Sequence, residues 1–180
     1  MQLNGRHALA AGAILAGLVV HASTPVASAH GRSRREFSAK LESFNEVPSL
    51  STEARGSFRA KLNRDKDALR YKLSYSGMTG TVTQSHIHLG QKHTNGGVMV
   101  FLCQAASTDP TGLAPTCPAT EGSVEATLTA ANIIGPGGQG VPAGAFDEFV
   151  EALREDAAYV NVHTTMFGGG EIRGQVKEDD

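Results

Sequence analysis

Short segments in which apolar and polar residues alternate one by one recur along most of this 180-residue chain. The clearest are residues 56–62 (GSFRAKL) and 69–75 (LRYKLSY). A period of two places alternate side chains on opposite faces of an extended strand, so it indicates β-strands with one buried face. Eight candidate strands lie at residues 37–41, 56–62, 69–75, 81–89, 98–103, 123–128, 159–166 and 171–176. Eight short strands at close spacing predict an all-β, antiparallel Greek-key sandwich or barrel.

One segment has a different period. Within residues 142–156, the four residues Phe146, Phe149, Val150 and Leu153 follow the spacing i, i+3, i+4, i+7. This spacing places them on a single stripe of an amphipathic helix. We therefore expect one short helix in this otherwise β-rich chain.

The first 29 residues have the pattern of a secretory signal peptide. Arg6 precedes a thirteen-residue apolar run at residues 8–20, and small residues follow up to the sequence Ala-Ser-Ala that ends at Ala29. The apolar run is shorter than the roughly 20 residues that a membrane-spanning helix needs. We expect cleavage between Ala29 and His30, export to the periplasm or the medium, and no transmembrane anchor in the mature chain.

The mature chain is then expected to have a basic arm at 30–35, one β domain at 36–177 and an acidic tail at 178–180. Its two cysteines are Cys103 and Cys117. An oxidising compartment favours a disulfide between them. The alternative, a pair of thiolate metal ligands, would require both cysteines to stay reduced.

The overall charge excludes one class of partner. Sixteen Lys and Arg residues against eighteen Asp and Glu residues give a formal net charge of −2. Nucleic-acid binding draws most of its affinity from a basic surface, so we expect no nucleic-acid partner.

Three histidines share a pattern that suggests a metal site. His86 and His88 alternate with apolar neighbours, so both imidazoles lie opposite the aliphatic face of their strand. His163 lies in the same way opposite the valines of a later strand. Two rings at this spacing are roughly 7 Å apart at Cβ, close enough to converge on one ion. The set has the composition of a copper or zinc site.

Other polar residues have more than one interpretation. His93 follows in a loop, where it is either a fourth ligand or a turn residue. Histidines on a strand are also common as surface or hydrogen-bonded side chains, without any metal. For Glu46, Glu171 and Arg173 the expected environment is a solvated or salt-bridged surface.

The last two candidate strands predict a hairpin with a three-residue turn at 167–169. Opposed residues of an antiparallel pair share a face, which in this register sets His163 opposite Arg173 and Asn161 opposite Gln175, all on the outward face. A guanidinium beside His163 would lower the pKa of the imidazole. It would also attract an anion to an open coordination position.

Four motifs resemble the CHRD domain, a module named from chordin that also occurs in exported bacterial proteins. They are FNEVP at 44–48, HIHLG at 86–90, YVNVHT at 159–164 and GEIRGQ at 170–175. The resemblance covers about residues 36–177 and implies a single Greek-key β domain outside the cytoplasm. In chordin these modules belong to an extracellular growth-factor antagonist, which implies an extracellular or envelope protein as partner.

A more distant similarity is to copper-zinc superoxide dismutase. That family also has a His-x-His strand, a further His on a later strand and an Arg near copper. The similarity implies copper at His86, His88 and His163, with Arg173 as anion guide. No Gly-Asp-rich loop with clustered zinc ligands follows His93. Three functions remain open: a copper- or zinc-binding domain, a non-catalytic interaction module without metal, and a dismutase-like enzyme.

Overall fold

The computed structural model describes residue 2 and residues 35–179. The expected signal peptide and its cleavage site therefore lie outside the described residues, apart from Gln2. The described part contains nine strands and one α-helix. The strands are β1 (Glu36–Glu42), β2 (Arg55–Leu62), β3 (Leu69–Ser76), β4 (Val82–Leu89), β5 (Gly97–Gln104), β6 (Gly122–Leu128), β7 (Ala158–Thr164), β8 (Ile172–Gln175) and β9 (Lys177–Glu178).

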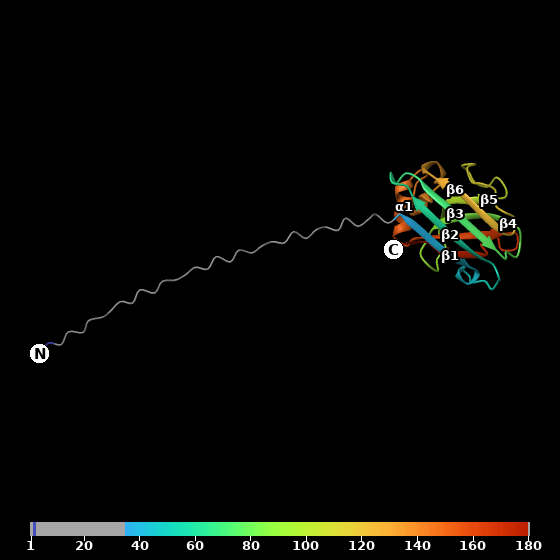
Figure 1. The fold of residues 1–180 in the computed structure, drawn as a ribbon, viewed down its shortest axis with the longest axis horizontal. Coiled ribbons are helices and arrows are strands. Elements are labelled where there is room, and N and C mark those ends of the chain that lie inside the picture. The colour runs from blue at the N-terminus through green and yellow to red at the C-terminus, as the bar shows by residue number, and fades with distance from the viewer. Residues whose placement is uncertain (1, 3–34, 180) are drawn as a thin grey trace. The chain divides into compact units, whose positions relative to one another are not determined.

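The strands form one antiparallel sheet that is nearly closed into a barrel (Figure 1). Their order is β5-β4-β7-β8-β1-β2-β3-β6, and β9 pairs with β1. The C-terminal strands β7 and β8 are therefore inserted between β4 and β1. The expected all-β, antiparallel fold of about eight strands is confirmed. The consequence for the site is that β4 and β7, far apart in sequence, are direct neighbours.

The helix α1 (Phe146–Arg154) is the amphipathic helix expected from the sequence. The side chains of its apolar stripe are all buried. It is shorter than residues 142–156, because Gly144 and Asp156 have left-handed backbone conformations with φ of 82° and 55°. No helix in residues 35–179 is long and apolar enough to cross a membrane.

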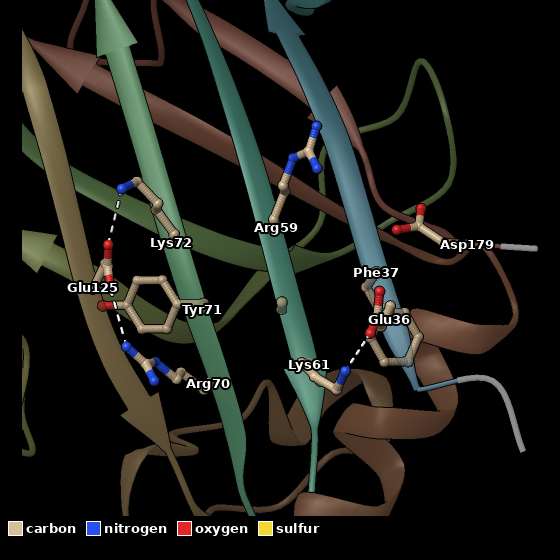
Figure 2. A pocket seen from close by; sticks show the side chains of 10 residues that line it. Glu36, Phe37, Arg59, Lys61, Arg70, Tyr71, Lys72, Glu125 and Asp179 are labelled. Atoms are coloured by element: carbon tan, nitrogen blue, oxygen red, sulfur yellow. Dashed lines mark hydrogen bonds and ion pairs between the residues drawn. The ribbon is translucent and has the colours of Figure 1, made fainter.

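The outward face of β1, β2, β3 and β6 carries charged side chains (Figure 2). Glu125 accepts from Arg70 at 3.3 Å and from Lys72 at 2.9 Å, and Glu36 pairs with Lys61. All of these side chains are exposed, and ion pairs of this kind contribute little to stability. The alternation of apolar and polar residues along these strands predicts such a solvent-exposed face.

The C-terminal residues continue the sheet. Glu178 of β9 pairs with Phe37 of β1, and the hydroxyl of Ser38 donates to Asp179. Of the segment expected as an acidic tail, 178–180, Glu178 thus belongs to a strand and Asp179 is hydrogen-bonded to β1.

The β7–β8 hairpin differs from its predicted register. Asn161 pairs with Arg173, and Tyr159 pairs with Gln175. The predicted pairing of His163 with Arg173 is therefore wrong by two residues. The physical reason is a wider turn, in which the N–H groups of Thr164 and Gly170 both donate to the carbonyl of Phe167. A shift of two residues preserves which side chains share a face.

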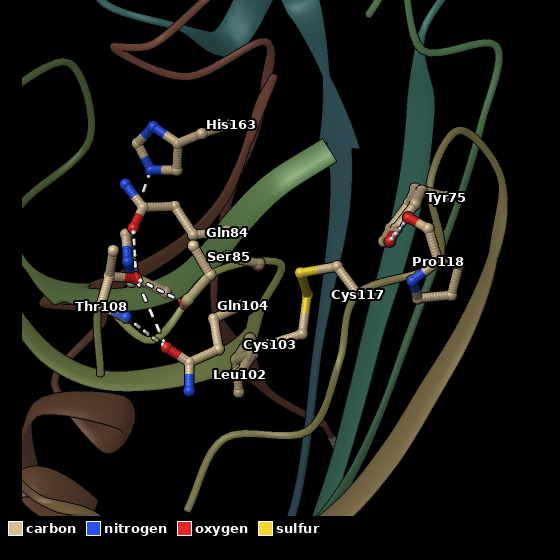
Figure 3. The surroundings of a disulfide bond; sticks show 12 residues. Tyr75, Gln84, Ser85, Leu102, Cys103, Gln104, Thr108, Cys117, Pro118 and His163 are labelled. Carbon is tan, nitrogen blue, oxygen red and sulfur yellow. Dashed lines mark hydrogen bonds between the residues drawn. A yellow bond between two sulfur atoms is a disulfide. The ribbon is translucent and has the colours of Figure 1, made fainter. Parts of the chain in front are cut away.

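A disulfide joins Cys103 at the end of β5 to Cys117 in the following loop (Figure 3). The two cysteines are 14 residues apart in sequence. The bond closes the loop between β5 and β6, and the backbone N–H of Cys117 donates to the carbonyl of Gln104.

We expect the double substitution Cys103→Ala and Cys117→Ala to lower the free energy of unfolding by about 3 kcal/mol, because the unfolded chain loses a loop constraint of this size. Urea unfolding of the oxidised protein and the double variant measures the difference. Equal midpoints and slopes for the two proteins would contradict the expectation.

Candidate metal centre

The side chains of β4, β7 and β8 that point away from the apolar core form a buried polar layer. Its members are His86, His88, Asn161, His163 and Arg173, and none is more than 8% exposed. The solvated or salt-bridged surface expected for Arg173 is therefore wrong. Both faces of β7 are buried along its whole length.

The loop at residues 90–96 is fixed over this layer. The guanidinium of Arg173 donates to the carbonyls of Gln91, at 3.3 Å, and Thr94. It also donates to Oδ1 of Asn95 at 3.0 Å. These bonds attach the loop to β8, which explains how a polar face becomes buried.

Arg173 also packs on an aromatic ring of the same layer. Its guanidinium carbon lies 3.4 Å from the ring centroid of Tyr159. The imidazole of His88 stacks on the same ring, with centroids 4.7 Å apart. Since β7 lies between β4 and β8, the ring of Tyr159 has His88 on one side and Arg173 on the other. The positive charge expected beside His163 thus lies nearest to Tyr159 and the 90–96 loop.

Glu171 is also buried, with 0% exposure. Its carboxylate accepts from the N–H of Thr79 at 2.9 Å and the hydroxyl of Thr79 at 2.6 Å. It also accepts from the hydroxyl of Thr164 at 2.9 Å. The surface position expected for Glu171, like that of Arg173, is wrong. Each has neutral partners that allow it to be buried.

The structure brings His86, His88 and His163 together. Each ring provides one nitrogen, and these three nitrogens all lie within 4.8 Å of one another. The closest pair is Nδ1 of His86 and Nε2 of His163, 3.1 Å apart. His93 is not part of this group. It is exposed in the 90–96 loop, where its backbone has a φ of 65°.

Backbone carbonyls orient two of the three rings. Nδ1 of His88 lies 2.9 Å from the oxygen of Gly96, and Nδ1 of His163 lies 3.0 Å from the oxygen of Gly168. A carbonyl oxygen only accepts, so each Nδ1 carries a proton. The Nε2 atom of each neutral ring then has a free lone pair directed into the cluster.

The environment favours neutral imidazoles. Burial lowers the pKa of His88 to about 4, and it also lowers the pKa values of His86 and His163. Burial is the largest cause for all three, because it disfavours the charged form. A neutral imidazole is the form that binds a metal ion.

Two buried polar atoms have no hydrogen-bond partner in the described part of the chain: Nε2 of His86 and Oε1 of Glu46. Glu46 is only 5% exposed, and burial raises its pKa to about 7. Buried polar atoms without a partner are rare in folded proteins, and an ion or a water molecule is a common explanation for them.

Residues 37–176 match the family model of the CHRD domain. The chain belongs to the CHRD family. No curated protein and no solved structure matches it. The resemblance inferred from the four motifs is thereby confirmed for nearly the whole folded part of the chain.

Sequence reasoning gave no role to two buried polar residues of this CHRD domain, Asn161 and Glu46. Asn161 was assigned to the correct face, but without a role in the cluster. Glu46 was expected at the surface, although its position within the FNEVP motif was a signal of its importance. Strand parity finds the residues that share a face, but it does not reveal which loop covers them.

Proposed function

We propose that this CHRD domain binds a copper or zinc ion through His86, His88 and His163. The observation that carries the proposal is the convergence of three buried imidazole nitrogens within 4.8 Å of one another. Imidazole nitrogen is a common ligand for both metals.

The orientation of the rings supports the same proposal. Histidine ligands in metal proteins usually donate their second N–H to a carbonyl or carboxylate, which fixes the tautomer and the ring angle. Gly96 and Gly168 provide such carbonyls for His88 and His163. An ion at this position would also bind Nδ1 of His86, which lies 3.1 Å from Nε2 of His163.

We expect purified protein without a His-tag to bind one zinc or copper(II) ion, and His163→Gln to weaken the affinity at least about 100-fold, because it removes one of three ligands. Isothermal titration calorimetry measures both. His93→Gln is the matched control and is expected to bind like the parent protein. Absence of binding to the parent, or equal affinity for His163→Gln, would contradict the proposal.

We also propose that the domain is exported and that its partner is an extracellular or envelope protein. The pattern of residues 1–29 and the occurrence of the family outside the cytoplasm support this. Amino-terminal sequencing of secreted material is expected to start at His30. A mature protein that retains the first 29 residues would contradict it.

A dismutase-like activity has less support. It requires Arg173 to guide an anion to the metal. In the structure the guanidinium donates to the 90–96 loop and packs on Tyr159. We therefore propose a binding site and no reaction.

A further inference from the structure

We infer that Asn161 supplies a fourth ligand through its amide oxygen, so that the site is a closed, four-coordinate zinc centre. This inference rests on the proposed binding by the three histidines. The inference adds an oxygen ligand to the three histidine nitrogens, and it specifies a divalent ion with a structural role.

The distances fit such a centre. Oδ1 of Asn161 lies 3.1 Å from Nε2 of His88 and 3.0 Å from Nε2 of His163. The closest nitrogen pair, between His86 and His163, is 3.1 Å apart. In a tetrahedron with zinc–ligand distances of 2.0–2.1 Å, neighbouring ligand atoms are separated by about 3.3 Å. Three of the six edges are therefore already close to the length that zinc requires.

The chemistry of the facing atoms points to a cation. His88 and His163 each use their Nδ1 proton on a backbone carbonyl, so each Nε2 presents a lone pair. The amide oxygen of Asn161 presents lone pairs as well. Lone pairs that face one another at 3 Å repel in a buried, low-dielectric layer, whereas a positive ion between them would bind all of them.

The amide nitrogen of Asn161 is directed towards Gly170 and Glu46. Nδ2 of Asn161 and Oε1 of Glu46 both lie within 3.0 Å of the position that a Cβ atom on Gly170 would occupy. The amide N–H group therefore lies on the side of the Glu46 carboxyl group, and the amide oxygen lies on the side of the rings.

Burial makes the site closed. Asn161 is 3% exposed, and the three histidines are 3–8% exposed. Structural zinc sites have four protein ligands, whereas catalytic sites leave one position for water or substrate. A closed site predicts that zinc stabilises the fold by binding the native state alone.

The test compares parent protein, Asn161→Ala and Asn132→Asp, each loaded with cobalt(II) as a spectroscopic substitute for zinc. Asn132 lies outside the cluster, where its side-chain oxygen accepts from the N–H of Thr129, a bond that aspartate preserves. It controls for a substitution at a partly buried asparagine. We expect azide to leave the visible spectra of the parent and Asn132→Asp unchanged. It should change the spectrum of Asn161→Ala, where a coordination position has opened. Zinc affinity should fall about 10- to 100-fold for Asn161→Ala.

The outcomes separate the two proposals. If the parent binds none of zinc, cobalt(II) and copper(II), the proposed function fails. If it binds copper(II) but neither zinc nor cobalt(II), the histidine site stands and the four-coordinate zinc centre is overturned. If the parent binds zinc but azide changes its spectrum as much as that of Asn161→Ala, the histidine site stands and the fourth ligand is overturned. Equal zinc affinities for the parent and a folded Asn161→Ala would overturn it as well. Circular dichroism shows whether each variant is folded.

Discussion

Lowering the pH from 6.5 to about 4 is expected to destabilise the metal-free domain by several kcal/mol. The pKa of His88 falls from its ordinary 6.5 to about 4 in the folded chain, because the ring is buried. Between these values the unfolded chain binds a proton that the folded chain does not, so the free energy of unfolding decreases as the pH falls. For His88 alone the effect is on the order of 3 kcal/mol. Burial also lowers the pKa values of His86 and His163, so these two residues likewise reduce the free energy of unfolding as the pH falls.

One buried group opposes this trend. The pKa of Glu46 is raised to about 7 from its ordinary 4.5 by burial. Its folded form keeps a proton that the unfolded form has lost, so its contribution to stability decreases as the pH rises from 4.5 to 7. Glu46→Gln removes this opposing effect, and we expect a steeper acid dependence for that variant.

Urea unfolding at a series of pH values measures the dependence. His88→Gln is expected to flatten it, and His93→Gln, at an exposed position of the 90–96 loop, is the control for replacing a histidine. A parent protein with the same stability at pH 6.5 and pH 4, or a slope unaffected by His88→Gln, would show that the rings are not held neutral.

The substitution Gly170→Ala is expected to lower the free energy of unfolding by about 4 kcal/mol, since it combines backbone strain with overpacking. Gly170 has a φ of 125°, which side-chain-bearing residues rarely adopt. Its Cβ atom would come within 3.0 Å of both Glu46 and Asn161. Because Asn161 lies against the histidines, the same substitution should also weaken zinc binding.

Gly169→Ala is the matched control. No heavy atom lies within 4 Å of the Cβ position at this neighbouring glycine. Its stability should differ little from that of the parent protein. Thermal and urea unfolding of both variants tests the contrast. Similar stabilities for Gly169→Ala and Gly170→Ala would contradict the close contact with Glu46.

The strands and their faces are predictable from the sequence because they depend on local alternation. In β3, for example, Leu69, Tyr71, Leu73 and Tyr75 are buried in turn, as the period of two requires. The same parity correctly placed His86, His88 and His163 on one face. These features follow from two constraints that hold for every strand: the pleat and the burial of apolar side chains.

The features that were not predictable depend on contacts between distant parts of the chain. The register of the β7–β8 hairpin was wrong because the turn at Phe167 is wider than the glycines suggested. The burial of Arg173 depends on the loop at 90–96, about 80 residues earlier, whose carbonyls it binds. A charged residue in an alternating strand predicts a solvent-exposed side chain, unless the distant groups that bind its charge are already known.

The attachment of the 90–96 loop by Arg173 has a consequence for rates. An ion held beneath this loop leaves only when the loop opens, so its residence time depends on Arg173 as well as on the ligands. Arg173→Lys keeps the charge but loses the planar set of donors that reaches several acceptors at once. It should therefore speed the release of bound metal to a chelator more than it changes the affinity at equilibrium. Through this loop, a residue that is not itself a ligand would control how fast the centre exchanges its ion with the surroundings.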